Sequence, residues 1–60
     1  MTPAAFTSWR LSLSLSVDAA AEALGISRST IQRYEAGTLP IPVSVALATR
    51  YLSILYLINH

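Results

Sequence analysis

The sequence predicts a small all-α domain of four to five helices that occupies residues 1–60 as a single unit. Apolar residues recur at spacings of three and four, which is the period of an amphipathic helix. Hydroxyl side chains and a proline stand where helices would begin, and glycines stand where two of them would end. Sixty residues without cysteine allow one small core and no disulfide, so we expect a marginally stable monomer.

The composition argues against an enzyme. The chain has one histidine, three acidic residues and no cysteine, which argues against a metal cluster and against paired-carboxylate catalysis. No cofactor is expected. The net charge is only +1, so nucleic-acid binding cannot be inferred from charge alone. The hydrophobic fraction of 53% is high for this length and suggests a partner surface. No signal peptide is visible, which fits a cytoplasmic protein.

The first helix is expected to begin at Thr2-Pro3, because threonine caps helices and proline suits the first helical position. Phe6, Trp9 and Leu13 form its apolar stripe, with Trp9 in the core. Leucine and serine alternate over residues 11–16, as in a strand. We reject a strand because it would have no partner, and place a turn at Ser14-Leu15.

Ser16 caps the second helix, and Asp18 lies in its first turn, where the helix dipole favours an anion. Gly25 ends it. The inner face is apolar and consists of Val17, Ala20, Ala21 and Leu24.

Ser27 caps the third helix, and Ile26 with Ile31 forms a hydrophobic staple around that cap. The third helix runs to about Ala36, and Gly37 stops it. Two short helices joined by a tight glycine turn, over about residues 16–36, form a helix-turn-helix.

This segment resembles the Cro/cI (XRE-type) family of phage-repressor-like DNA-binding domains. The matching residues are Ala20, Ala21, Leu24, Gly25, Ile26, Ser27, Ser29, Thr30, Ile31, Arg33, Tyr34, Glu35 and Gly37. The resemblance extends from Trp9-Arg10 to Pro42. It implies a Cro/cI repressor-like fold whose third helix enters the major groove of double-stranded DNA. The sequence departs from the family at Ser14, where glycine is usual, and at Val17, where glutamine is usual.

At about 100° per residue, Ile31 and Tyr34 of the third helix point into the core. Ser29, Gln32 and Arg33 point outward, with Arg28 at the N-terminal edge. Arginine suits guanine and glutamine suits adenine. The resemblance implies Arg28, Ser29 and Arg33 as base readers, followed by Gln32, with Ser27 and its backbone at a phosphate and Thr38 as a further DNA contact. The alternative is a solvated helix face, which is the commoner fate of residues such as Ser29 and Gln32 taken alone.

Glu35 lies beside the core face of the third helix. The resemblance implies a structural ion pair between Glu35 and Arg10 of the first helix. The alternative is two unrelated surface charges.

A C-terminal helix is expected over about residues 43–58, and residues 51–58 are apolar at every position except Ser53. Such a surface cannot all be buried in so small a domain. A dimer interface is favoured, formed by Tyr51, Leu52, Leu55, Tyr56 and Ile58. A truncated end whose missing sequence covers the surface is the second interpretation. A membrane segment is the third; it is disfavoured because the run is shorter than about 20 residues and contains Arg50.

These features predict a homodimeric, sequence-specific repressor that reads a pseudo-palindromic operator in a prokaryotic or phage setting. Activation of transcription is also open. The alternative is an antitoxin-type DNA-binding protein whose apolar C-terminal helix binds a second protein.

Overall fold

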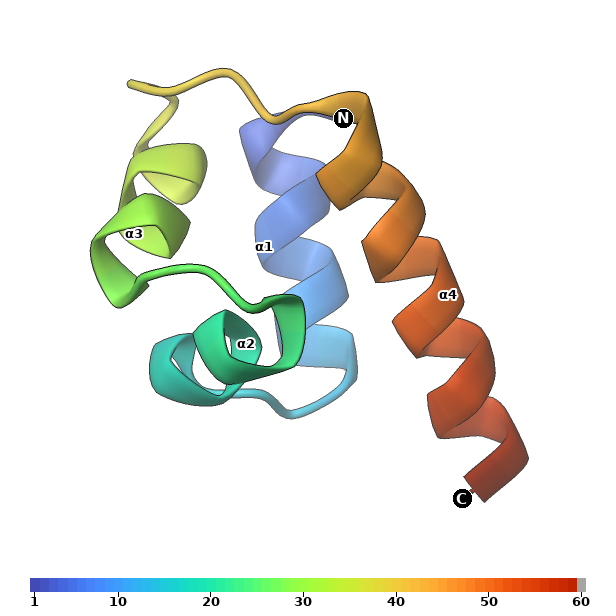
Figure 1. Cartoon of the computed structure of the whole chain (residues 1–60). Coiled ribbons are helices and arrows are strands. Elements are labelled where there is room, and N and C mark those ends of the chain that lie inside the picture. Colours follow the sequence, from blue (N-terminus) through green and yellow to red (C-terminus); the bar gives the residue numbers. More distant parts are fainter. Residues whose placement is uncertain (60) are drawn as a thin grey trace.

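The computed structural model of the chain describes residues 1–59, which form four α-helices and no strand (Figure 1). The helices are α1 (Pro3–Ser12), α2 (Val17–Leu24), α3 (Arg28–Ala36) and α4 (Val43–Asn59). In Figure 1, α1 and α2 lie in the middle, with α3 and α4 on opposite flanks. The predicted all-α class is confirmed. His60, the single histidine that cannot by itself form a metal cluster, lies outside the described residues.

Local hydrogen bonds fix where the first three helices begin. The hydroxyls of Thr2, Ser16 and Ser27 each accept a hydrogen bond from the backbone N–H three residues later, at 3.0–3.2 Å. Each bond satisfies one of the donors that a helix leaves unpaired at its start. The residue before α4 is Pro42, which has no side-chain acceptor, so only its carbonyl accepts from the N–H groups of Val45 and Ala46.

The same backbone motif ends α1, α2 and α3. A residue with a left-handed backbone follows each helix: Ser14 (φ 56°), Gly25 (φ 70°) and Gly37 (φ 78°). The N–H of the next residue then donates to the carbonyl five positions earlier, at 3.0–3.1 Å. This is the Schellman arrangement. Glycine takes a positive φ without strain, but a residue with a Cβ does not, so the turn at Ser14 is strained.

The core joins α1, α2 and α3 into one packed unit. The ring of Phe6 is completely buried, with its centroid 5.5 Å from that of Trp9 and 5.6 Å from that of Tyr34. The other buried apolar residues are Ala20, Ala21 and Ile31. The indole nitrogen of Trp9 is buried and has no hydrogen-bond partner among residues 1–59, so Trp9 contributes through its ring area. This packing holds α3 at a fixed orientation on the domain.

α4 contributes much less to the core. Thr49 is the single α4 residue in the described chain that is fully buried, and its hydroxyl donates to the carbonyl of Ala46 at 2.7 Å. Val45 and Leu52 are half-buried and pack against the core. No helix within residues 1–59 is long and apolar enough to span a bilayer. Because α4 buries so little against the core, much of its apolar surface is left uncovered by the rest of the domain.

Candidate nucleic-acid interface

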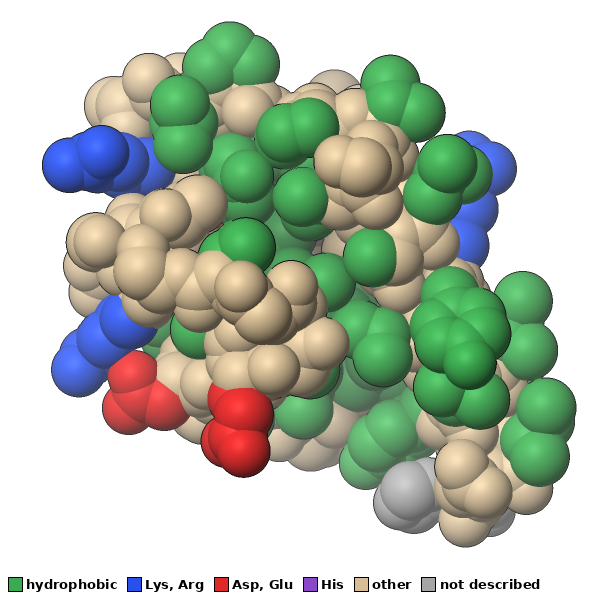
Figure 2. All heavy atoms as spheres, in the orientation of Figure 1, with side chains coloured by type: hydrophobic (Ala, Val, Ile, Leu, Met, Phe, Trp, Pro, Cys, Tyr) green, Lys and Arg blue, Asp and Glu red, His purple; other side chains and the backbone are tan. Residues whose placement is uncertain are grey.

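The outward face of α3 carries the polar side chains that the sequence assigns to DNA. Arg28, Ser29, Gln32 and Arg33 are all exposed. Ile31 and Tyr34 of the same helix are buried, so packing fixes the rotation of α3 about its axis. Figure 2 shows basic side chains along the α3 flank and hydrophobic side chains gathered over α4. Side chains that can hydrogen-bond base edges thus lie together on the exposed side of α3.

The start of α3 is suited to an anion. The Ser27 hydroxyl lies 2.7 Å from the hydroxyl of Thr30 and 3.2 Å from that of Ser29, in addition to its capping bond. This hydroxyl is therefore occupied within the cap. The first N–H groups of α3 have no acceptor within the helix, and they lie at the positive end of its dipole. A phosphate at this point would be bound by backbone N–H groups rather than by the Ser27 side chain.

Thr38 lies at the opposite end of α3. Its side chain is exposed, and both its backbone N–H and its hydroxyl donate to the carbonyl of Arg33, at 3.1 and 3.4 Å. It can face DNA only at the C-terminal edge of the α3 surface.

Arg10 and Glu35 are brought together by the packing of α1 against α3. Arg10 donates from Nε to Oε2 of Glu35 at 2.6 Å and from Nη2 to Oε1 at 3.1 Å. Its remaining nitrogen, Nη1, donates to the carbonyl of Leu15 at 3.0 Å. Only 15% of the Arg10 side chain and 18% of the Glu35 side chain are exposed. The hydrogen bond to Glu35 raises the pKa of Arg10 above its ordinary value despite partial burial, which opposes it. Arg10 is thus occupied inside the fold and turned away from solvent.

Sequence reasoning missed a second ion pair, which lies at the candidate interface. Nε of Arg28 lies 3.4 Å from Oδ1 of Asp18, joining the first turns of α2 and α3. The sequence relates Asp18 only to the dipole of its own helix, because it does not show that these two helix starts meet. Among residues 1–59, neither Arg33 nor Arg50 forms an ion pair, and Arg50 lies on α4, away from α3. Arg28 and Arg33 are therefore the arginines available on the α3 face.

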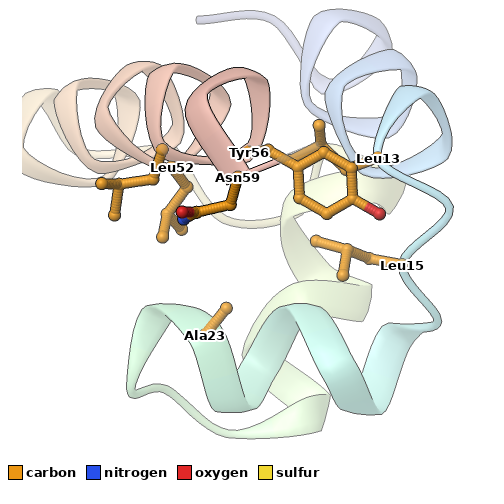
Figure 3. Close-up of a pocket in the computed structure, with 7 residues that line it drawn as sticks. Leu13, Leu15, Ala23, Leu52, Tyr56 and Asn59 are labelled. Carbon is orange, nitrogen blue, oxygen red and sulfur yellow. The ribbon is translucent and has the colours of Figure 1, made fainter.

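The residues assigned to a dimer interface fall on two different sides of α4. Leu52, Leu55 and Tyr56 are half-buried and point toward the body of the domain. They line an apolar pocket of about 160 Å³ together with Leu13, Leu15, Ala23 and Asn59 (Figure 3). Tyr51 and Ile58 are exposed on the other side. We use the term outer face of α4 for the exposed apolar residues of this helix, which are Val43, Leu47, Tyr51, Ile54, Leu57 and Ile58.

The dimer interface stays a prediction, and this division shows which of its residues are exposed in the single chain. Leu52, Leu55 and Tyr56 are half-buried beside Leu13, Leu15 and Ala23, so they offer a second copy less surface than the exposed residues do. The sequence could not separate the two sides because this stretch of α4 is apolar almost all round.

The α3 flank carries hydrogen-bonding and cationic side chains. Within the described residues, no group of three or more His, Cys, Asp or Glu side chains could hold a metal ion. What the α3 flank offers is a helix held by the core, with exposed arginine, glutamine and serine side chains and the positive end of its dipole at the N-terminus. This arrangement can contact a phosphate and read base edges at the same time.

Comparison with known proteins supports the same interpretation. No curated protein and no solved structure matches the chain. A family model described as a helix-turn-helix domain matches residues 4–55, which include all of α2 and α3 and most of α1 and α4. This match is consistent with the XRE-type resemblance of the sequence. The chain belongs to the helix-turn-helix domain family.

Proposed function

We propose that the protein is a sequence-specific transcriptional regulator that binds operator DNA by placing α3 in the major groove. The observation that carries this proposal is the exposed face of α3, where Arg28, Ser29, Gln32 and Arg33 project from a helix whose other side is locked into the core. Arg33 and Arg28 would contact guanine O6 and N7, and Gln32 would contact adenine. Repression, by blocking access of the polymerase to the promoter, is the simplest output, and the protein would act in the cytoplasm of a prokaryotic cell.

Charge favours a dimer as the active species. The α3 face of one copy offers at most two arginines to DNA, and one of them, Arg28, is already paired with Asp18. Each neutralised phosphate contributes only about 0.9 to the salt slope. One copy would therefore bind weakly, whereas two linked copies make the second contact intramolecular. The two half-sites would then be about one helical turn apart, and the operator would be pseudo-palindromic.

The outer face of α4 is the surface that supports this homodimer. Its six side chains are each between 55% and 80% exposed, so most of their apolar surface faces solvent in the single chain. Four of them, Leu47, Tyr51, Ile54 and Ile58, follow one another at spacings of four, three and four residues, which is the heptad spacing of helices that pack side by side. Because α4 and α3 lie on opposite flanks, a partner on α4 leaves the α3 face open (Figure 1).

The same apolar surface favours a second candidate, an antitoxin-type regulator. In that case α3 would still bind DNA, and the outer face of α4 would bind a different protein. The two candidates differ in what the purified chain does alone. A homodimeric regulator sediments as a dimer and binds a symmetric site by itself, whereas the antitoxin-type protein remains monomeric until its partner is added.

The experiment that tests the proposal is selection of bound sequences from a pool of random duplexes. The expected result is enrichment of a two-fold symmetric site with half-site centres about 10 base pairs apart. Enrichment of a single unrepeated half-site would retain DNA recognition but contradict the dimer. No enrichment, with equal affinity for every duplex, would contradict sequence-specific regulation.

A further inference from the structure

The ion pair between Asp18 and Arg28 places a carboxylate on the surface that would meet DNA. The two side chains are 73% and 64% exposed, respectively. Exposed pairs of this kind contribute little to the stability of a fold. A negative charge beside a DNA-binding surface also opposes binding, because it repels the phosphates. Neither the stability of the fold nor the affinity for DNA therefore explains this ion pair.

The geometry points to selectivity. The carboxylate of Asp18 lies against Nε of Arg28, on one edge of the guanidinium. This arrangement leaves the two terminal Nη groups for other acceptors. A pair of parallel N–H donors is what arginine uses to contact O6 and N7 of guanine.

We propose that Asp18 is a specificity-determining residue, which holds Arg28 for end-on recognition of a guanine and keeps it off the phosphates. This inference rests on the proposed DNA-binding function. Holding the arginine in place reduces the side-chain ordering that binding requires at the correct base pair. At a wrong base pair, or on random DNA, Arg28 stays paired with Asp18, so the pair adds no net positive charge toward the phosphates. Asp18 thus lowers affinity for all DNA and raises the preference for one base.

The proposal predicts that one substitution, Asp18→Asn, raises the affinity for random DNA and lowers the discrimination between bases. Asp18→Asn keeps the size of the side chain and leaves the Ser16 cap of α2 in place, but it removes the charge. Affinity for random duplex is expected to rise by about fivefold, the upper range for loss of one exposed charge interaction. Discrimination at the base pair read by Arg28 is expected to fall by a similar factor. That base pair is identified beforehand from the position at which Arg28→Ala loses preference.

Glu22→Gln is the matched control. Glu22 is exposed on α2 one turn after Asp18 and has no ion pair within residues 1–59. Its substitution removes the same charge from the same helix without releasing Arg28. It should leave the base preference unchanged, whatever it does to overall affinity.

Binding is measured at one salt concentration to the selected operator, to the operator with the Arg28 base pair replaced, and to random duplex. Asp18→Asn combined with Arg28→Lys provides a second test, because lysine lacks the planar pair of donors, and the Asp18 effect on preference should then disappear. If Asp18→Asn and Glu22→Gln change affinity for all three duplexes by the same factor, Asp18 is only a general charge and the inference is overturned. If the wild-type protein itself prefers no sequence, it is the proposed function that fails.

Discussion

Arg10 donates two parallel hydrogen bonds to Glu35, which lies 25 positions later in the chain. The same guanidinium also binds the carbonyl of Leu15, in the turn between α1 and α2. One side chain thus connects α1, the turn before α2, and the helix that carries the DNA-facing residues. The orientation of α3 depends on this contact as well as on the aromatic core.

Arg10→Ala is expected to destabilise the domain by about 2–3 kcal/mol, because it leaves the largely buried Glu35 carboxylate without its charged partner. DNA binding measured well below the melting temperature should change less. Thermal unfolding followed by circular dichroism, with DNA titration at low temperature, checks both. Arg50→Ala, an exposed arginine on α4, is the control and should shift stability by less than about 0.5 kcal/mol. An Arg10→Ala protein that melts like the wild type but loses DNA would instead identify Arg10 as a DNA contact.

Ser14→Gly is expected to stabilise the domain by about 0.5–1 kcal/mol, because Ser14 has the left-handed backbone that glycine adopts without strain. Gly25 and Gly37 already hold the same position after α2 and α3. Ser8→Gly, at an exposed position inside α1, should have the opposite sign, since glycine weakens a helix interior. Denaturant unfolding of both variants measures the difference, and a Ser14→Gly variant less stable than the wild type would show that the strain argument fails.

Arg33→Ala should reduce affinity for the selected operator by about 1–3 kcal/mol and relax the base preference at one position of each half-site. Arg33 is exposed on α3 and forms no ion pair within the described chain, so its loss should leave the melting temperature nearly unchanged. Arg50→Ala removes the same charge from the opposite flank and should leave the base preference intact. Equal losses on operator and random duplex would make Arg33 a phosphate contact rather than a base reader.

Ile54→Glu is expected to give a folded monomer that loses operator binding by more than tenfold. Ile54 lies at the middle of the outer face of α4 and is 57% exposed, so a charge there is tolerated in the monomer but not in an apolar interface. Analytical sedimentation and a binding titration test this. Leu11→Glu, at a similarly exposed leucine of α1, is the control that should remain dimeric. Leu55→Glu should instead lower the stability of the monomer, because Leu55 lines the apolar pocket between α2 and α4.

Features that depend on neighbouring residues in the chain could be predicted from sequence. The caps at Thr2, Ser16 and Ser27 are local hydrogen bonds, and Gly25 and Gly37 end helices through their own backbone freedom. The separation of buried and exposed residues on α3 follows from the helical period, because polar and apolar positions alternate clearly there.

Features that depend on tertiary geometry could not be predicted. The approach of Asp18 to Arg28 requires the first turns of two helices to meet, and no local pattern encodes that distance. The hydrogen bond from Arg10 to the carbonyl of Leu15 involves a backbone group, which leaves no trace in residue type. The division of α4 into an inner and an outer side is set by where α1 and α2 lie, since leucine, isoleucine and tyrosine occur on both sides.

The position of Trp9 gives the protein an intrinsic optical reporter. Trp9 is the only tryptophan in the chain, and it lies in the core beside Phe6, away from both the outward face of α3 and the outer face of α4. Its fluorescence therefore follows the integrity of the α1–α3 unit. Unfolding should shift the emission to longer wavelength as the indole enters water, whereas DNA on α3 or a second copy on α4 should leave the spectrum nearly unchanged. Loss of folding and loss of binding can thus be distinguished in a single sample, without a label.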